Sequence, residues 1–323
     1  MSALAIETEA LTKVFGKGSN TVRAVNGIDL KVDKGAVFGF LGPNGAGKTS
    51  TIRILTGIAR PTSGRALILG EEISPDQQNA KRAIGYMPEI PGFYPAMKAI
   101  DHLVFWADFY KIPTVEARNR GRDLLASVGL GEAAQRKAKD FSHGMKKRLA
   151  LAGALINDPE VLILDEPSGG LDPEGTIFFR RLIDEQKQRG RTIFLSSHLL
   201  PEVQLICTRV AILNRGELVA VDTVEELARK VTSRAPVRVH VDCQPLSQQQ
   251  LALVGAMPGV TGIAFHPNGV LVSAVPGTPL GYPLNRALMD AGVRVEAFYP
   301  LIPSLEEVFL ELISTGTKKG GSR

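Results

Sequence analysis

The chain of 323 residues is poor in cysteine and has no long apolar run. Its two cysteines, Cys207 and Cys243, lack the spacing of a metal site or a redox pair. We therefore expect reduced, buried side chains, not a disulfide framework. The longest apolar stretches, such as residues 149–156, hold about eight residues, whereas a membrane helix needs roughly 18. The sequence thus predicts no membrane span.

A strong charge excess is also missing, and we expect no secretion leader. The net charge is +5 and the pI is near 9.2. The basic residues are scattered over expected helices and the tail 318–323, which favours solvated surfaces over a nucleic-acid site. Residues 3–14 alternate between apolar and polar side chains, as a strand does, where a leader would be charged and then apolar. We expect a cytoplasmic protein, unless a partner brings it to a membrane.

What the chain does contain is a glycine-rich loop, GPNGAGKTS, at residues 42–50. Gly42, Gly47, Lys48 and Thr49 have the spacing of a P-loop. Glycine permits backbone angles that turn successive N–H groups toward phosphate oxygens. Lys48 adds a positive charge for the outer phosphates, and the hydroxyl of Thr49 can ligate Mg²⁺.

The surroundings of this loop favour a phosphate site over a plain glycine-rich turn. The apolar run 36–41 precedes it as a buried strand would, and a helix beginning near residue 49 would direct its positive end at the same anion. The sequence therefore predicts that the loop binds a nucleoside triphosphate. The candidate contact residues are Gly42, Pro43, Asn44, Gly45, Ala46, Gly47, Lys48, Thr49 and Ser50.

Two adjacent carboxylates follow a second apolar run, VLILDEP, at residues 161–167. Asp165 fits the Walker B aspartate, which holds Mg²⁺ in P-loop nucleotidases. Glu166 could orient and partly deprotonate the water that attacks the terminal phosphate. Two neighbouring acids can also form a solvated turn. Their place after a buried strand and downstream of a P-loop favours catalysis.

The pattern of apolar residues predicts an α/β domain over residues 1–235 and a smaller α+β domain over 236–316, with a disordered tail at 317–323. The first domain combines a parallel sheet with an antiparallel β subdomain near the N-terminus and a helical subdomain at about 88–159. The second has the order β-α-β-β-α-β of a ferredoxin-like fold. A final helix with Ser304 and Glu307 as a capping box would follow.

With these motifs, residues 4–235 resemble the ATPase subunit of an ABC transporter. In that family a second motif, usually LSGGQ, precedes the Walker B strand, and here residues 141–145 read FSHGM. Ser142 and Gly144 match, whereas His143 and Met145 do not. The resemblance implies that Ser142 and Gly144 contact the ATP bound by a second subunit. In isolation, Ser142 would be read as a helix N-cap.

The resemblance implies roles for four further residues. Asp172 would link the two nucleotide sites of a dimer, and His198 would contact the γ-phosphate as the switch histidine. Phe15 would stack on adenine, although a core phenylalanine would look the same. Glu89 stands where the family commonly has a glutamine that approaches Mg²⁺. We assign no role to the remaining histidines, His102, His143, His240 and His266.

The resemblance implies an ATPase that forms a homodimer, or a heterodimer with a similar ATPase, around two MgATP. A separate transmembrane permease would contact the segment 91–94, with Phe93 and Tyr94, and hold the chain at the cytoplasmic face of the membrane. The C-terminal domain resembles that of ATPases serving ABC-2-type exporters, which favours export.

Two alternatives stay open. One is a soluble ABC ATPase acting on nucleic acid or ribosomes. Such proteins usually carry a coiled coil or two cassettes, and neither is evident here, so no direct nucleic-acid contact is expected. The other is a regulatory module without turnover, which the degenerate FSHGM motif and Glu89 would suit.

Overall fold

The computed structural model describes residues 3–16, 18–232, 236–301, 306–307 and 309–310. Its contacts divide the chain into two compact units, residues 1–223 and 224–322. Helix α8 (Val224–Thr232) therefore belongs to the second unit, whereas the sequence analysis placed the domain boundary after residue 235. Residue 304 of the expected capping box and the tail 317–323 lie outside the described residues.

A six-stranded sheet forms the centre of the N-terminal unit. Its neighbours β9, β3, β8, β7 and β6 run parallel, and β10 is antiparallel to β9. All residues of β3, β7 and β8 are buried, as expected for strands covered on both faces. Apart from Asp165 at the end of β7 and Thr192, Ser196 and Ser197 at the ends of β8, they are apolar. The strands in sheet order are β10 (Glu217–Thr223), β9 (Arg209–Asn214), β3 (Val37–Leu41), β8 (Thr192–Ser197), β7 (Val161–Asp165) and β6 (Ile84–Met87).

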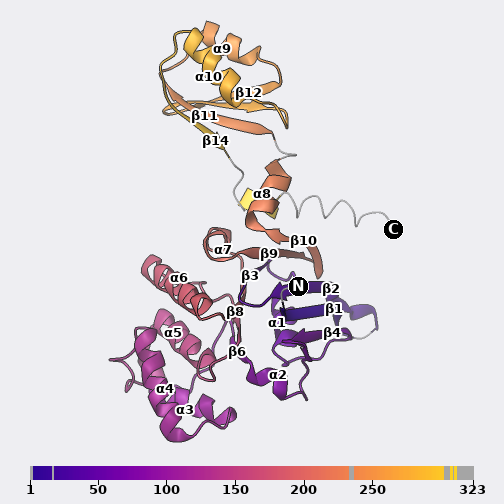
Figure 1. Ribbon diagram of the computed structural model, residues 1–323, viewed down its shortest axis with the longest axis vertical. Helices are drawn as coiled ribbons and strands as arrows, with labels where there is room; N and C mark the ends of the chain where they lie inside the picture. Colours follow the sequence, from indigo (N-terminus) through magenta and orange to yellow (C-terminus); the bar gives the residue numbers. More distant parts are fainter. Residues whose placement is uncertain (1–2, 17, 233–235, 302–305, 308, 311–323) are drawn as a thin grey trace. The chain divides into compact units, whose positions relative to one another are not determined.

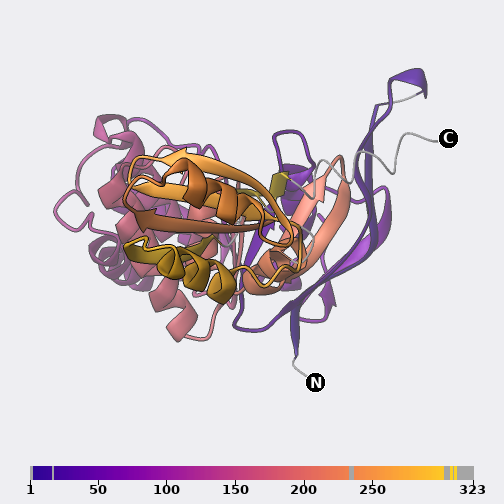
Figure 2. The same ribbon diagram turned by 90° about the horizontal axis from the view of Figure 1, so that it is seen from above.

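An antiparallel sheet lies beside the central one, as the alternating sequence predicts. Its long central pair is held in register by Ile6 opposite Val32 and, on the other side, Ile6 opposite Ile68. Seen from above, the indigo strands β1 and β2 run as a long pair on the side of the unit away from the magenta helices (Figure 2). The strands in sheet order are β2 (Val22–Asp33), β1 (Leu4–Phe15), β4 (Ser63–Ile68) and β5 (Glu71–Glu72).

The helices of the N-terminal unit fall into two groups. Helices α3, α4 and α5 gather at one side of the central sheet, within the range predicted to be helical, while α1 packs against β2, β4 and β7 (Figure 1). The helices are α1 (Lys48–Leu55), α2 (Asn79–Arg82), α3 (Ala99–Phe109), α4 (Thr114–Ser127), α5 (His143–Ala154), α6 (Pro173–Gln188) and α7 (Leu200–Ile206), with 3-10 turns η1 (Gly18–Asn20) and η2 (Ala138–Asp140).

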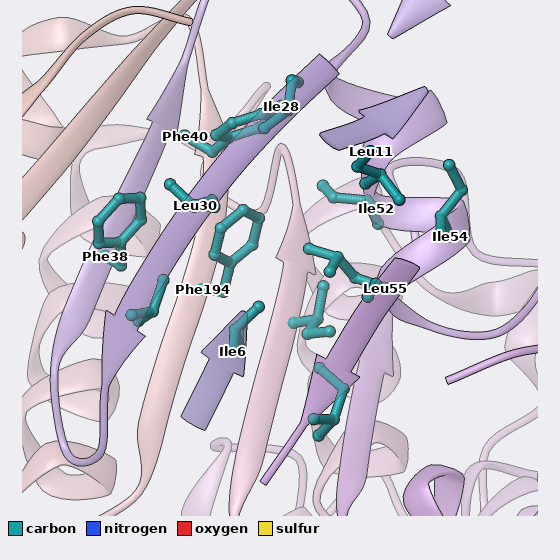
Figure 3. Close-up of a cluster of buried hydrophobic side chains, with 14 of the residues drawn as sticks. Ile6, Leu11, Ile28, Leu30, Phe38, Phe40, Ile52, Ile54, Leu55 and Phe194 are labelled. Atoms are coloured by element: carbon teal, nitrogen blue, oxygen red, sulfur yellow. The ribbon is translucent and has the colours of Figure 1, made fainter. Parts of the chain in front are cut away.

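The two sheets and α1 share one apolar core. Figure 3 shows Ile6, Leu30, Phe38, Phe40 and Phe194 within this cluster, with further side chains from α1. The ring of Phe194 stacks on Phe38 at 5.8 Å between centroids and meets Phe40 at 5.3 Å. Aromatic pairs at such distances add roughly 0.5–1.5 kcal/mol to the burial of their area. The core thereby fixes β3 and β8, whose carboxyl ends carry functional candidates.

The C-terminal unit has the predicted ferredoxin-like order. Its sheet, β12-β13-β11-β14, is antiparallel throughout, and α9 begins at a capping box between Ser247 and Gln250. Cys243 is buried in this unit and Cys207 in the other, as expected. Beyond α8, the elements are β11 (Val237–Cys243), α9 (Gln248–Gly255), β12 (Val260–His266), β13 (Gly269–Ala274), α10 (Gly281–Asp290) and β14 (Val295–Leu301).

No helix among the described residues is long and apolar enough to span a bilayer.

Candidate active site

The predicted phosphate loop connects the buried strand β3 to helix α1. Gly47 stands at the N-cap of α1 with φ +108°, a left-handed angle that glycine adopts without cost. A Cβ at Gly47 would lie 2.1 Å from the carbonyl oxygen of Ala24, so a side chain there has neither the angle nor the space. Pro43, Asn44 and Gly45 form the exposed crest of the loop. The loop thus presents backbone N–H groups and a helix N-terminus to solvent, as an anion site requires.

Lys48 begins α1 but its side chain turns back under the loop. It is only 7% exposed; its Nζ donates to the carbonyl oxygen of Gly42 at 2.6 Å and lies 3.4 Å from Oε1 of Glu166. A buried ammonium that is paired on one side and close to a loop of N–H groups supplies positive charge where phosphate oxygens would lie. The structure therefore brings the predicted lysine and the predicted general base into one site.

Glu166 is held from two sides. Its Oε2 accepts from the ring Nδ1 of His198 at 2.7 Å and from the backbone N–H of His198 at 3.3 Å. The carboxylate is nearly buried, while the His198 side chain is 53% exposed. With Nδ1 directed at the carboxylate, Nε2 is the ring nitrogen left for a ligand. Glu166 itself has a left-handed backbone, φ +47°, which is rare outside glycine.

Asp165 ends β7 and is 1% exposed. Its Oδ1 accepts from the hydroxyl of Ser196 at 2.6 Å, and the same hydroxyl accepts the backbone N–H of Glu166 at 3.0 Å. Burial raises the pKa of Asp165, and the charge of Glu166 adds to this, whereas the hydroxyls of Ser196 and Thr49 and the charge of Lys48 lower it. One hydroxyl therefore joins both carboxylate residues, and Ser196 was not among the site residues predicted from the sequence.

The oxygen atoms gathered here suit Mg²⁺. Asp165 and Thr49 offer a carboxylate and a hydroxyl, and both are hard ligands. The described residues contain no group of three or more His, Cys, Asp or Glu side chains able to hold a metal. That donor set fits an ion that keeps several waters and binds through one or two protein oxygens plus substrate phosphates, as Mg²⁺ does.

The other predicted residues lie at helix starts around this centre. Ser142 is the N-cap of α5 and accepts the Met145 N–H at 3.2 Å. Asp172 is the N-cap of α6 and accepts the Gly175 N–H at 2.8 Å. Gly144 lies in the first turn of α5. These roles as caps leave both helix N-termini directed outward with exposed side chains.

Phe15 and Glu89 are the last two candidates. Phe15 ends β1 with 45% of its surface exposed, and the ammonium of Lys13 lies 5.2 Å from its ring centroid. An exposed ring of this kind suits stacking better than core packing. Glu89 is exposed, two residues after β6. Its charge acts on Tyr86, whose pKa burial raises to about 12 with contributions from Asp165 and Glu89.

A second feature follows Glu89 in the chain: an apolar hollow of about 320 Å³. Its lining residues are Tyr86, Pro88, Pro91, Gly92, Trp106, Phe109, Tyr110, Ala150, Gly153 and Ala154. Phe109 is 72% exposed, so the apolar hollow opens at the surface. The ring of the buried His102 lies 5.5 Å from that of Trp106, and His102 is itself held by the Tyr94 N–H, which donates to its Nε2 at 3.0 Å, and by Lys98 O, which accepts from its Nδ1 at 2.9 Å.

Comparison with known proteins identifies this arrangement. Over 317 residues the chain is 36% identical to the bacitracin transport ATP-binding protein BcrA of Bacillus licheniformis, with 97% of this chain and 98% of BcrA covered. The chain belongs to the ABC transporter ATP-binding proteins. The ABC transporter family model matches residues 25–169 of this ATPase. A second relative is the daunorubicin/doxorubicin resistance ATP-binding protein DrrA of Streptomyces peucetius, 32% identical over 95% of this chain and 92% of DrrA.

Solved structures agree on the fold of the ABC ATPase. It is similar to cbiO1 from Clostridium perfringens, part of the ABC transporter complex cbiONQ, at 30% identity with a TM-score of 0.61 over 72% of this chain and 96% of that one. A dimeric ATP-binding cassette bound to ADP and phosphate matches with a TM-score of 0.63 and 22% identity, over 68% and 98%. Both similarities cover about the length of the N-terminal unit.

Proposed function

We propose that this ABC ATPase hydrolyses MgATP with Glu166 as general base and His198 as the residue that orients it. The observation that carries the proposal is the buried carboxylate of Glu166, fixed between Lys48 and His198 at the end of a parallel strand. A base in this position takes a proton from water as the water oxygen bonds to the γ-phosphorus, and the bond to the β-phosphate oxygen breaks to give ADP. Mg²⁺ bound by Asp165 and Thr49 would neutralise developing phosphate charge.

We also propose that two such subunits enclose the ATP. Ser142 and Asp172 cap helices whose N-termini are exposed, and no other part of the described chain covers the crest formed by Pro43 to Gly45. A second copy, or a similar ATPase, would supply the start of its own α5 to the γ-phosphate. The replacement of glycine by His143 leaves the helix dipole and the Ser142 hydroxyl in place. The dimeric cassette of the same fold supports this arrangement.

Export by a separate permease completes the proposal. The relatives named for bacitracin transport and for daunorubicin and doxorubicin resistance match almost the whole chain, including the C-terminal unit. The hollow lined by Trp106 and Phe109 is apolar and partly exposed, and such a surface suits a helix of a membrane partner. The ATPase would then act from the cytoplasmic face of the membrane.

Substitution of Glu166 tests the function. Glu166→Gln keeps the size and loses the base, so ATP turnover should fall at least a hundredfold while ATP binding persists. The matched control is Glu160→Gln. Glu160 is exposed and directly precedes β7, at the end of the strand opposite Glu166, so this variant should hydrolyse ATP at the normal rate. Phosphate release and equilibrium binding of a fluorescent ATP analogue are the readouts. Normal turnover by Glu166→Gln refutes the assignment, and no turnover by the unsubstituted ATPase with its permease favours the regulatory module.

A further inference from the structure

Lys147 is a buried lysine to which the proposed mechanism gives no role. It lies in the second turn of α5 and is only 5% exposed. Its Nζ donates to the carbonyl oxygens of Glu166 at 2.8 Å and Pro167 at 3.3 Å, and also to that of Gly169. An ammonium has three protons and no acceptor, so these three carbonyls use its full donor capacity.

The three carbonyls belong to the tight turn that carries the general base. Gly169 N–H donates to Glu166 O at 3.3 Å and closes the turn. Glu166 has φ +47° and Gly170 has φ +71°, so two residues near the turn lie in the left-handed region. A side chain in that region costs on the order of 1–3 kcal/mol and persists only where the surroundings enforce it. The ammonium of Lys147 is the charged group to which three carbonyl oxygens of this turn bond.

The same helix begins at Ser142, the residue proposed to face the second subunit's ATP. The start of α5 also lies close to the segment after the turn. A Cβ built on Gly144 would lie 3.9 Å from the Leu171 side chain, and a Cβ built on Gly170 would lie 3.3 Å from the His143 ring. Helix α5 thus contacts the 166–171 segment at its first turn and holds it at its second. A shift of the helix cannot leave the turn unmoved while the three bonds last.

We propose that Lys147 is a positioning residue for ATP hydrolysis: it fixes the backbone of Glu166 to helix α5, so that contact of the α5 N-terminus with the opposite nucleotide sets the general base of its own site. The inference rests on the proposed function of Glu166. The inference adds a connection within one subunit: the first turns of α5, from Ser142 to Lys147, would join the two nucleotide sites.

The charge of Lys147 suits this role. Burial lowers the pKa of its ammonium, whereas the carboxylates of Glu166 and Glu89 raise it. The carbonyl dipoles replace the water that the ammonium gives up. An uncharged replacement of similar length would fill the space and leave buried carbonyl oxygens without donors.

The test compares Lys147→Met and Lys147→Gln with the control Lys146→Met. Lys146 has the same charge, is the adjacent residue of α5, and makes none of the side-chain hydrogen bonds found among the described residues. In the full chain, Lys147→Met should lower kcat for ATP at least tenfold and change the affinity for a fluorescent ATP analogue less than threefold. Lys146→Met should stay within twofold in both. Combined with Glu166→Gln, Lys147→Met should change the residual rate less than twofold, because it acts through Glu166.

Hydrogen–deuterium exchange across residues 166–171 gives a readout that needs no turnover. Lys147→Met should speed exchange there at least tenfold and Lys146→Met should not. An unsubstituted ATPase that fails to hydrolyse ATP refutes the proposed function, while the exchange data still judge Lys147. If Lys147→Met yields no folded protein, Lys147→Gln decides by the same measures with at least a threefold loss of kcat. Wild-type kcat, unchanged exchange, or a rate loss that adds to that of Glu166→Gln overturns the inference.

Discussion

Replacing Ser196 by alanine tests whether one hydroxyl holds both carboxylate residues. Ser196 ends the apolar part of β8 and is fully buried. Its Oγ donates to Asp165 Oδ1 at 2.6 Å and accepts Glu166 N–H at 3.0 Å. Ser196→Ala removes both bonds and adds no bulk. The perturbation therefore isolates the hydroxyl.

The expected cost follows from the two bonds. A hydrogen bond to a charged group contributes ~1.5–3 kcal/mol, and a buried N–H left without an acceptor costs about 1–3 kcal/mol. Because the two share one oxygen they are not additive, and we expect the free energy of unfolding to fall by roughly 3 kcal/mol. Ser197→Ala is the matched control: Ser197 is equally buried, but its hydroxyl only accepts the Leu199 N–H at 2.9 Å. It should cost about 1 kcal/mol.

The loss of stability in Ser196→Ala should also depend on pH, through the titration of Asp165. The native pKa of Asp165 is raised from the ordinary 3.8, so the native state holds the proton longer than the unfolded chain does, and stability falls as the pH rises from 3.8 through the native pKa. Ser196 lowers that pKa. Loss of Ser196 raises the native pKa of Asp165 further and so extends the pH range over which stability falls. The loss of unfolding free energy in Ser196→Ala should therefore be larger at about pH 8 than at about pH 5. Urea unfolding without Mg²⁺ measures it. A deficit equal to that of Ser197→Ala at both pH values refutes the reasoning.

Three further predictions concern single side chains. Burial lowers the pKa of His102, and only the neutral ring accepts the Tyr94 N–H. The contribution of His102 to stability should therefore be full above pH 6.5, the ordinary pKa of histidine, and be lost as the pH falls through the native pKa. The urea midpoints of the wild type and His102→Asn should converge on acidification. Phe15→Ala should raise KM for ATP roughly fivefold or more, as loss of base stacking costs ~1–3 kcal/mol, whereas Phe15→Trp should retain wild-type KM in steady-state kinetics. Gly47→Ala should abolish ATP binding in equilibrium titrations, while Gly45→Ala, with φ +78° and no atom within 4 Å of its Cβ, should lose about 1 kcal/mol of stability.

The parts of the site that follow strands were predictable from sequence. Short apolar runs that end at a P-loop or at paired carboxylates are typical of buried strands in an α/β chain, so the P-loop after β3, the carboxylates after β7 and His198 after β8 were expected to meet at one sheet edge. The structure places Lys48, Glu166 and His198 within direct contact there. The C-terminal unit was predictable from alternating strands such as β11, in which Val239, Val241 and Cys243 are buried, and from the Asn268–Gly269 turn between β12 and β13.

Short elements with weak patterns were missed. Strand β6 has four residues, including Gly85 and Tyr86, and lies at the edge of the central sheet. Its pairing with β7 depends on tertiary contact and not on local propensity. Helix α7 has seven residues with Pro201 in its first turn, too short for a helical period to emerge. The sequence analysis likewise did not expect α8 as a separate helix.

The polar residues that were missed share a physical reason. Ser196 binds the N–H of Glu166 and Lys147 binds its carbonyl oxygen. Neither bond is encoded by side-chain spacing, since each joins residues 19 or more positions apart through the main chain. One anchor comes from the central sheet and the other from α5 in the helical group. The backbone of Glu166, the proposed general base, is thus held at its N–H by a strand of the central sheet and at its carbonyl oxygen by α5. In the proposed mechanism, Lys147 connects the helix that begins at the FSHGM motif to the backbone of Glu166.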